Sequence, residues 1–121
     1  MTDDFDFKKH PFEKRVIESE RIKSKFPDRI PIIVERYKKS KENVPFLDKH
    51  KYLVPFDMTF GQFVYVIMKR LYGKCNSEQS IFLFINGMIP CLTDNMQTLH
   101  NQHKDKDGFL YCTYTVQNTF G

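Results

Sequence analysis

The sequence predicts a small α+β domain in which one long helix lies on a mixed sheet. A helical repeat of apolar residues occupies the middle of the chain, at 60–71, and β-branched or aromatic runs lie on both sides of it, at 30–37, 52–56, 80–85 and 109–114. The chain has 121 residues and is 40% hydrophobic, which suits one domain with a single core. The spacing of the runs does not fix the order of the strands.

The N-terminal third is expected to form a helix and a buried strand. Residues 1–10 are polar apart from two phenylalanines and predict a mobile or loosely docked lead-in. Helical spacing over 12–26 predicts a helix that ends at Pro27. Its sparse apolar stripe consists of Phe12, Val16, Ile22 and Phe26. The run at 30–37 has the composition of a buried strand.

The second strand, at 52–56, contains a proline that confines it to a sheet edge or to its own end. An edge strand presents N–H and C=O groups that can accept an extended peptide. Lys49 and Lys51 flank the strand and would favour acidic flanks on such a peptide. The same lysines can instead protect the edge from aggregation, and the spacing does not choose between these interpretations.

The central helix has signals at both ends. Thr59 is a predicted N-cap, and Gly73 is a predicted left-handed C-terminal cap. After it, Asn86 and Gly87 predict a two-residue hairpin that joins 80–85 to a return strand at 88–92.

The end of the chain is expected to hold a short helix and a last strand. Thr93 is the predicted cap of that helix, with Met96 and Leu99 facing inward. A turn is predicted at 105–108, and residues 117–121 show no core pattern and are expected to form a free tail.

Charge and cysteine content narrow the classes of partner. Residues 8–51 hold 14 Lys and Arg against 7 Asp and Glu, which indicates an acidic peptide, a tubulin-like tail or anionic lipid as partner, or simply a solubilising surface. No apolar run approaches the roughly 20 residues of a membrane helix, and the first 20 residues are charged and unlike a secretory signal. Three scattered cysteines suit a reducing compartment, and Cys91 and Cys112 are expected in the core.

No arrangement of residues predicts an enzyme. The five glycines are isolated, so no phosphate-binding loop is expected. His100 and His103 share a helix face but have no third ligand nearby, which favours two solvated histidines. No Cys/His relay surrounds Cys75. We therefore expect no catalytic residue, no metal and no nucleic-acid partner.

The chain closes with Asn-Thr-Phe-Gly. A glycine without Cβ can enter a narrow enzyme cleft in extended form, where its carboxylate could be activated and joined to an amine. The alternative is an ordinary chain end with no chemical role.

Six collinear segments carry a family resemblance: His-Pro-Phe-Glu-Lys-Arg at 10–15, Pro-Asp-Arg-Ile-Pro-Ile-Ile-Val-Glu at 27–35, Lys-Tyr-Leu-Val-Pro at 51–55, Gly-Gln-Phe at 61–63, Asp-Gly-Phe-Leu-Tyr at 107–111 and the closing Phe-Gly. From about residue 5 to 121 the sequence resembles the ubiquitin-like autophagy modifiers, a family that includes the GABA-receptor-associated protein and microtubule-associated light chain three.

The resemblance implies a ubiquitin-like β-grasp with two additional N-terminal helices. It divides the chain into an N-terminal helical extension at 1–27, a ubiquitin-like domain at 28–116 and a flexible conjugation tail at 117–121. It also implies that the protein is a substrate of conjugation and not an enzyme. A processing and delipidating cysteine protease would expose Gly121, and activating and conjugating enzymes would pass its acyl group through thioesters to the amine of phosphatidylethanolamine. No other cofactor is expected.

The resemblance further implies a peptide-binding site for receptors with an aromatic-x-x-aliphatic motif. The aromatic pocket would consist of Glu18, Ile22, Pro31, Ile33, Lys51, Leu53 and Phe109. The aliphatic pocket would consist of Tyr52, Val54, Pro55, Met58, Phe63, Val66 and Arg70. The backbone of Lys51 and Leu53 would pair with the peptide, and Arg29 and Lys49 would complete a basic rim.

The implied location is the cytoplasm and, after lipid anchoring, the membrane of autophagosomes or cytoplasmic vesicles. Tubulin is a further partner to consider, and an unconjugated trafficking or microtubule-linking adaptor that uses its basic face is the alternative function. The segments at 41–43 and 74–78 are longer than usual for the family, and Met68 and Phe56 depart from its pattern. These departures bear on partner preference.

Overall fold

The structure is a computed structural model that describes residues 5–39, 44–71 and 79–118. Along the chain, its elements are η1 (Phe7–Lys9), α1 (Phe12–Lys25), β1 (Arg29–Arg36), β2 (Lys51–Pro55), α2 (Phe60–Leu71), β3 (Gln79–Phe84), α3 (Met96–His103) and β4 (Leu110–Asn118). This mixture of helices around one sheet confirms the predicted α+β class.

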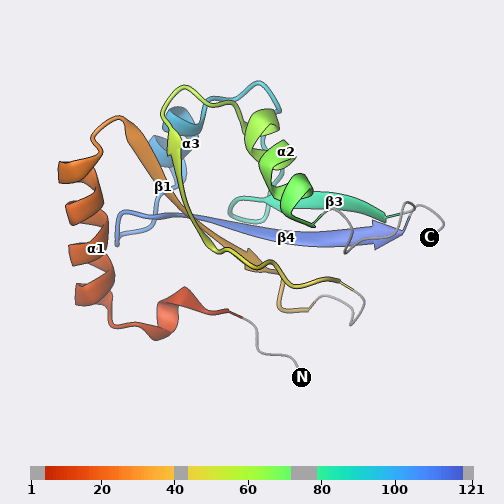
Figure 1. The fold of residues 1–121 in the computed structure, drawn as a ribbon, viewed down its shortest axis with the longest axis horizontal. Helices are drawn as coiled ribbons and strands as arrows, with labels where there is room; N and C mark the ends of the chain where they lie inside the picture. Colours follow the sequence, from red (N-terminus) through yellow and green to blue (C-terminus); the bar gives the residue numbers. More distant parts are fainter. Residues whose placement is uncertain (1–4, 40–43, 72–78, 119–121) are drawn as a thin grey trace.

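The four strands form one mixed sheet in the order β2-β1-β4-β3 (Figure 1). The two central strands, β1 and β4, are parallel, although they come from opposite ends of the chain. β2 pairs with β1 and β3 pairs with β4, both antiparallel. β2 is therefore an edge strand and ends at Pro55, so both positions that the proline allows are observed.

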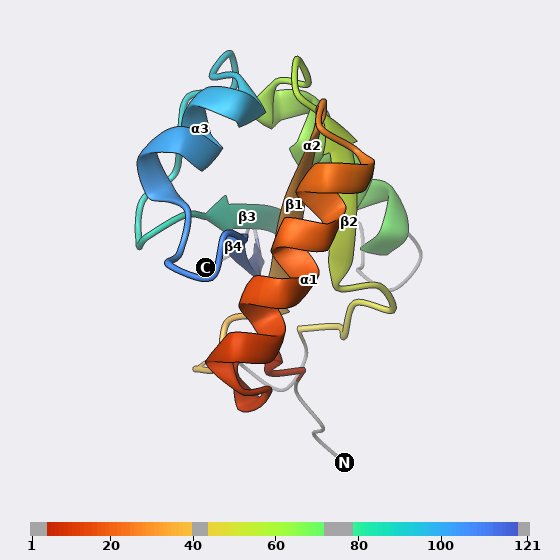
Figure 2. The same cartoon turned by 90° about the vertical axis from the view of Figure 1, so that its left-hand side faces the viewer.

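Both faces of the sheet are covered. α2 and α3 lie together on one side of it (Figure 1), and the main core cluster includes residues of both helices, such as Phe63 and Leu99. α1 crosses the other side (Figure 2), where Phe7, Ile33 and Phe109 form a second, smaller cluster. Burial on both faces explains why β1 is apolar at consecutive positions and does not alternate.

The central helix forms as its sequence predicts. Thr59 Oγ1 accepts the Gln62 N–H at 3.1 Å, and Gln62 Oε1 accepts the Thr59 N–H at 2.9 Å, which is a reciprocal capping box. Phe60, Phe63 and Ile67 lie on its buried face. The predicted C-terminal cap, Gly73, lies outside the described residues.

The N-terminal segment differs from the prediction of a loose lead-in. Phe7 is only 1% exposed, and its aromatic ring meets that of Phe109 edge to face, with centroids 5.0 Å apart. An apolar side chain of this size gains about 1.5–3 kcal/mol from such burial, so the segment from Phe5 onward is docked. The prediction was wrong because Phe7 has no periodic partners in its own segment.

The buried face of α1 also differs from the predicted stripe. Phe12 and Phe26, at the two ends of that stripe, are 45% and 41% exposed. The buried residues of this helix are Arg15 and Ser19, which find polar partners in the turn at 105–108. An apolar count cannot identify a helix face that is buried through hydrogen bonds.

The hairpin prediction is half right. Asn86 and Gly87 form the turn with φ values of +51° and +76°, but the return strand predicted at 88–92 is absent and only an isolated bridge joins Ile85 to Met88. The Leu92 carbonyl instead accepts the N–H of Gly61 at 2.8 Å. The segment thus satisfies the first N–H groups of α2.

Three smaller predictions near this segment have different outcomes. Cys91 is exposed and was wrongly expected in the core, whereas Cys112 is buried as expected. The side chain that caps α3 belongs to Asn95, which accepts the Gln97 N–H at 2.8 Å, and not to Thr93. Met96 and Leu99 face inward as predicted.

The last strand continues further than the apolar pattern indicates. β4 reaches Asn118, so the predicted tail at 117–121 overlaps the strand by two residues. Residues 119–121, including Gly121, lie outside the described residues. Across the described ranges, no helix is long and apolar enough to cross a membrane.

Candidate functional site

The outer side of β2 presents backbone groups to the open edge of the sheet. The Val34 N–H donates to the His50 carbonyl at 2.8 Å. This bond shows which of the opposed residue pairs of β1 and β2 are hydrogen-bonded to each other. Because hydrogen-bonded and non-bonded pairs alternate in an antiparallel ladder, the N–H and C=O groups of Lys51 and Leu53 point away from β1. Arg29 Nη1 already donates to the Leu53 carbonyl at 3.4 Å. These are the groups that, according to the family resemblance, would pair with a peptide.

The predicted aromatic-pocket residues gather on the α1 side of the sheet. Ile33 and Phe109 belong to the smaller core cluster, and Ile22 packs partly buried against it. Pro31 lies opposite Leu53 in the strand register. Leu53 itself is half-buried, so part of its side chain is accessible from the open edge.

The remaining two residues of the predicted aromatic pocket, Glu18 and Lys51, form an ion pair. Lys51 Nζ lies 3.0 Å from a carboxylate oxygen of Glu18 and 5.0 Å from the centroid of the Phe7 ring. Lys51 therefore connects β2, α1 and the N-terminal segment. Sequence reasoning missed Phe7 at this position, although two phenylalanines in a polar segment were the available signal.

The predicted aliphatic-pocket residues divide into an inner wall and an accessible part. Tyr52, Val54 and Phe63 belong to the main core and are at most 6% exposed. Met58 and Val66 are partly buried, and with Pro55 they line an open depression of about 770 Å³ beside the start of α2. The seventh residue, Arg70, lies 3.4 Å from the Asp48 carboxylate.

Tyr52 supports the wall of this pocket and is not available to fill it. Its hydroxyl donates to the Lys49 carbonyl at 2.8 Å, and its ring meets Phe63 edge to face with centroids 5.6 Å apart. Burial raises the pKa of the Tyr52 hydroxyl far above its usual range, so the side chain stays a neutral donor. Lys49, in the predicted basic rim, places Nζ 5.2 Å from the centre of the Tyr52 ring.

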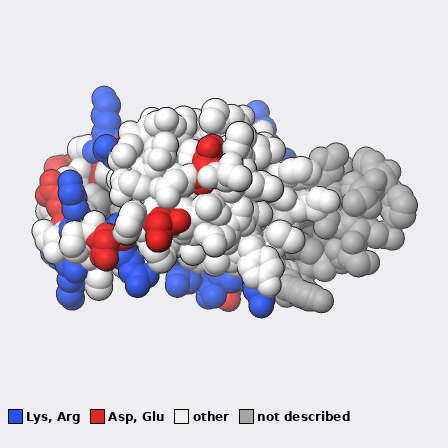
Figure 3. All heavy atoms as spheres, turned by 90° about the horizontal axis from the view of Figure 1, so that it is seen from above, with Lys and Arg blue, Asp and Glu red and all other residues white. Residues whose placement is uncertain are grey.

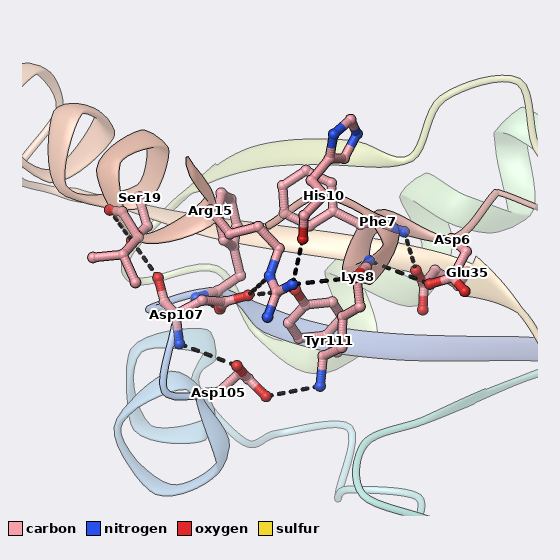
Figure 4. Close-up of polar contacts among 12 residues, drawn as sticks. Asp6, Phe7, Lys8, His10, Arg15, Ser19, Glu35, Asp105, Asp107 and Tyr111 are labelled. Carbon is pink, nitrogen blue, oxygen red and sulfur yellow. Dashed lines mark hydrogen bonds and ion pairs between the residues drawn. The ribbon is translucent and has the colours of Figure 1, made fainter. Parts of the chain in front are cut away.

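A polar network that sequence reasoning missed ties the two ends of the chain together (Figure 4). Arg15 Nε donates to Asp107 Oδ2 at 2.9 Å, and the side chains are 10% and 0% exposed. The Tyr111 hydroxyl also donates to Asp107. Arg15 Nη1 reaches the carbonyl of His10 at 2.7 Å. The available signal was the spacing of Arg15, Ser19 and Ile22, which fall on one helical stripe.

Charged groups hold the N-terminal segment against the rest of the protein. Lys8 Nζ pairs with Asp105 at 2.9 Å, and Lys38 Nζ pairs with Asp6 at 3.2 Å. The half-buried Glu35 accepts the backbone N–H of Phe7 at 2.9 Å, and burial raises the pKa of its carboxyl. These contacts fix the N-terminal segment so that Phe7 packs against Ile33 and Phe109, two residues of the predicted aromatic pocket.

The two histidines of α3 are both half-buried. His100 lies 2.8 Å from the Gly108 carbonyl through Nε2, and His103 lies 3.1 Å from the amide nitrogen of Asn86 through Nδ1. The expectation of two solvated rings was therefore wrong. Burial lowers the pKa of His100, and Lys104 and Lys23 lower it further. Within the described ranges, no group of three His, Cys, Asp or Glu side chains could hold a metal.

Comparison with known proteins decides the family. A family profile described as "Autophagy protein Atg8 ubiquitin like" matches residues 14–121. The chain is 53% identical to Autophagy-related protein 8c of Arabidopsis thaliana over 112 residues, which cover 93% of this chain and 91% of that protein. It is 52% identical to Autophagy-related protein 8 of Emericella nidulans, with coverage of 93% and 92%.

The chain belongs to the Atg8 family. The crystal structure of Trypanosoma brucei ATG8 matches it with a TM-score of 0.82 and 36% identity, over 99% of this chain and all of that one. The Atg8 match and the observed sheet confirm the ubiquitin-like β-grasp with added helices. They also identify the chain as a ubiquitin-like protein of autophagy.

Proposed function

We propose that this Atg8-family chain is conjugated through Gly121 to phosphatidylethanolamine, and that on autophagosomal membranes it recruits receptors with an aromatic-x-x-aliphatic motif. The observation that supports the recruitment most directly is the open edge of β2, with one predicted pocket on each side of the sheet. Family membership supports the conjugation, because the match extends through residue 121.

The spacing of the peptide motif suits this geometry. Side chains of an extended peptide alternate between the two faces of the sheet that it joins. Two anchors that are three residues apart therefore point to opposite faces. The aromatic anchor would enter beside Leu53 and Ile22 on the α1 side, and the aliphatic anchor would enter beside Met58 and Val66 on the α2 side. Main-chain hydrogen bonds to Lys51 and Leu53 would hold the strand between them.

Charge supports the choice of partner. Lys and Arg side chains lie at the α1 end and along one long edge of the molecule, with Asp and Glu side chains among them (Figure 3). Arg29 and Lys49 are both exposed beside β2. Acidic residues that flank the motif would meet this rim, which raises the rate of encounter more than the final affinity.

The conjugation proceeds by acyl transfer. The Gly121 carboxylate is adenylated with release of pyrophosphate, and an enzyme thiol displaces AMP to form a thioester. The amine of phosphatidylethanolamine then displaces the thiol and forms the amide. The two acyl chains of the lipid give the stable anchoring that a single chain does not. A cysteine protease would remove the lipid by hydrolysing the amide between Gly121 and the lipid amine, with water as the final acyl acceptor. In a precursor that continued past Gly121, it would hydrolyse the peptide bond after that residue.

Reconstituted lipidation tests this proposal. With activating enzyme, conjugating enzyme, ATP and vesicles that contain phosphatidylethanolamine, Gly121→Ala should abolish the lipid-linked product, because even a methyl group at the reacting residue obstructs a cleft built for glycine. Gly87→Ala is the matched control and should be lipidated like the original chain. Unchanged lipidation of Gly121→Ala would contradict the proposed attachment site.

A further inference from the structure

A second concave site lies away from the open edge of β2. A cleft of about 290 Å³ is enclosed by α1, the start of β1, α3 and the turn at 105–108. α3 and β2 lie on opposite sides of α1 (Figure 2). Only Pro31 and Arg29 line this cleft and also belong to the predicted peptide site, so a ligand here would not occupy the aromatic or the aliphatic pocket.

The cleft is bordered by cations from three directions. Lys23 comes from α1, Arg29 from β1, and Lys104 and Lys106 from the end of α3 and the following turn. Among the described residues, Lys23, Lys104 and Lys106 have no carboxylate within ion-pair distance. Like charges that converge without counter-charges are a ready site for an anion.

Negative charge in the lining is small. The Asp107 carboxylate is already paired with Arg15 at 2.9 Å. Glu20 is the other acidic side chain among the lining residues. The lining therefore holds four cations and one carboxylate, Glu20, that lacks a partner among the described residues. The net charge of the cleft is positive.

Neutral polar groups complete the lining. Gln97 Nε2 donates to Asn101 Oδ1 at 2.9 Å, which leaves the amide nitrogen of Asn101 and the amide oxygen of Gln97 for a ligand. Such groups suit hydroxyls. His100 lies in the same wall, and the lowering of its pKa by Lys104 and Lys23, in addition to burial, shows that the positive field reaches into the cleft.

We propose that this cleft binds a polyol that carries phosphate groups, such as an inositol phosphate, either free or as the headgroup of a phosphoinositide. Several phosphates on one rigid ring can reach lysines that stand on different walls, and the ring hydroxyls can meet the amides. A compact ligand suits a cleft that helices and a turn close on three sides. The proposal does not depend on conjugation at Gly121.

Calorimetric titration with inositol trisphosphate at low ionic strength tests the site. The double variant Lys23→Gln/Lys104→Gln should bind about a hundredfold more weakly, because it loses two hydrogen bonds to charged groups worth about tenfold each. The control Lys14→Gln/Lys69→Gln removes the same charge. Lys14 lies nine residues before Lys23 in α1, which places it on the opposite face of the helix, and Lys69 is in α2. The control should bind within about twofold of the original chain.

An NMR titration of His100 gives a second readout. The charged groups around its ring are Glu20 and Lys23 from α1, Arg29 from β1, and Lys104 and Lys106 beside α3, with Asp107 neutralised by Arg15. A bound phosphate favours the imidazolium form, so inositol trisphosphate should raise the pKa of His100. The ring should not respond to the ligand in Lys23→Gln/Lys104→Gln, whose fold is checked by circular dichroism.

Vesicles with and without the corresponding phosphoinositide distinguish the two sources. If the protein sediments with phosphoinositide vesicles and this depends on Lys23 and Lys104, the ligand is the lipid headgroup. If the protein binds only the soluble inositol phosphate, the ligand is the free metabolite. Either result supports the site. The proposal would be overturned if inositol trisphosphate did not bind, or if both double variants lost the same affinity for it. It would also be overturned if the ligand left the pKa of His100 unchanged, or if a glutamate-rich peptide bound in place of the phosphate.

Discussion

Gly108 lies where the turn before β4 packs closely against α1. Its φ is +95°, and a Cβ there would lie 2.5 Å from the Oγ of Ser19 in α1. Gly87 also has a positive φ, of +76°, but a Cβ there would meet nothing within 4 Å. The two glycines therefore separate the effect of backbone strain from the effect of a close contact.

Gly108→Ala is expected to lower the free energy of unfolding by about 2–4 kcal/mol, because it adds a steric clash to the strain of a left-handed backbone. Gly87→Ala should lower it by about 1 kcal/mol through strain alone. Ser19→Ala added to Gly108→Ala should recover part of the loss. Urea unfolding measures all three, and equal losses for the two glycines would contradict the contact.

Glu35 gives the stability of the protein a predictable pH dependence. Burial raises the pKa of its carboxyl above the ordinary value of 4.5. The folded protein therefore keeps this proton to higher pH than the unfolded chain does, and stability falls as the pH rises from 4.5 through the folded-state pKa. Asp6 and Asp105 have lowered pKa values, and their contribution is lost only as the pH falls below 3.8.

Glu35→Gln keeps an oxygen that can accept the Phe7 N–H but cannot ionise. The free energy of unfolding of this variant should therefore fall less steeply above pH 4.5 than that of the original chain. At neutral pH the variant should be the more stable of the two. Urea unfolding at a series of pH values checks this, with Glu13→Gln on the exposed side of α1 as control. A decline as steep in Glu35→Gln as in the original chain would show that other groups cause it.

At the scale of helices and strands, the sequence predicts an element well when the residues that cap it, break it or form its apolar face lie within that element. α2 has a capping box and a regular apolar face. β2 has a proline that allows only an edge position or the end of the strand, and both hold, because Pro55 is the last residue of this edge strand. The return strand at 88–92 was wrong because its backbone groups serve the start of α2, a contact that no local pattern encodes. The seven residues of each predicted pocket came from resemblance, and the structure shows which of them are core.

Leu53 is the best single probe of the edge strand. It is half-buried in β2, so Leu53→Ala should change the fold little and weaken an aromatic-x-x-aliphatic peptide by about tenfold or more, as anchoring contacts do. The same change at Tyr52 should instead destabilise the fold, because that side chain is only 6% exposed. Met88→Ala, beyond the opposite edge strand, is the control. Peptide titration with a melting curve measures both effects, and undiminished affinity in Leu53→Ala would remove Leu53 from the pocket.

At the scale of the whole molecule, the polar network connects α1 with the segment before β4. Arg15 and Asp107 are 92 residues apart in sequence, and neither residue alone predicts the other. A long-range ion pair of this kind cannot be read from spacing, since each partner looks like an ordinary surface charge until the fold places them together. The same holds for Phe7, whose partners lie in β1 and beside β4.

Asp107→Asn is expected to destabilise the protein by about 3–5 kcal/mol, because it leaves the Arg15 guanidinium without its counter-charge in a buried site. Asp28→Asn, at an exposed position after α1, should change stability by less than about 0.5 kcal/mol. Thermal and urea unfolding measure the difference. A loss in Asp107→Asn as small as in the control would mean that the pair is neutral for the fold.

The position of β4 has a mechanical consequence. This strand lies between β1 and β3 and runs to Asn118, three positions before the residue proposed to be joined to lipid. A pulling force that enters from that end acts along the axis of a strand held on both sides. The ladders on its two flanks would then have to rupture together in shear, whereas an outer strand could be peeled away one bond at a time. A modifier tethered to a moving membrane would resist tension best with this arrangement.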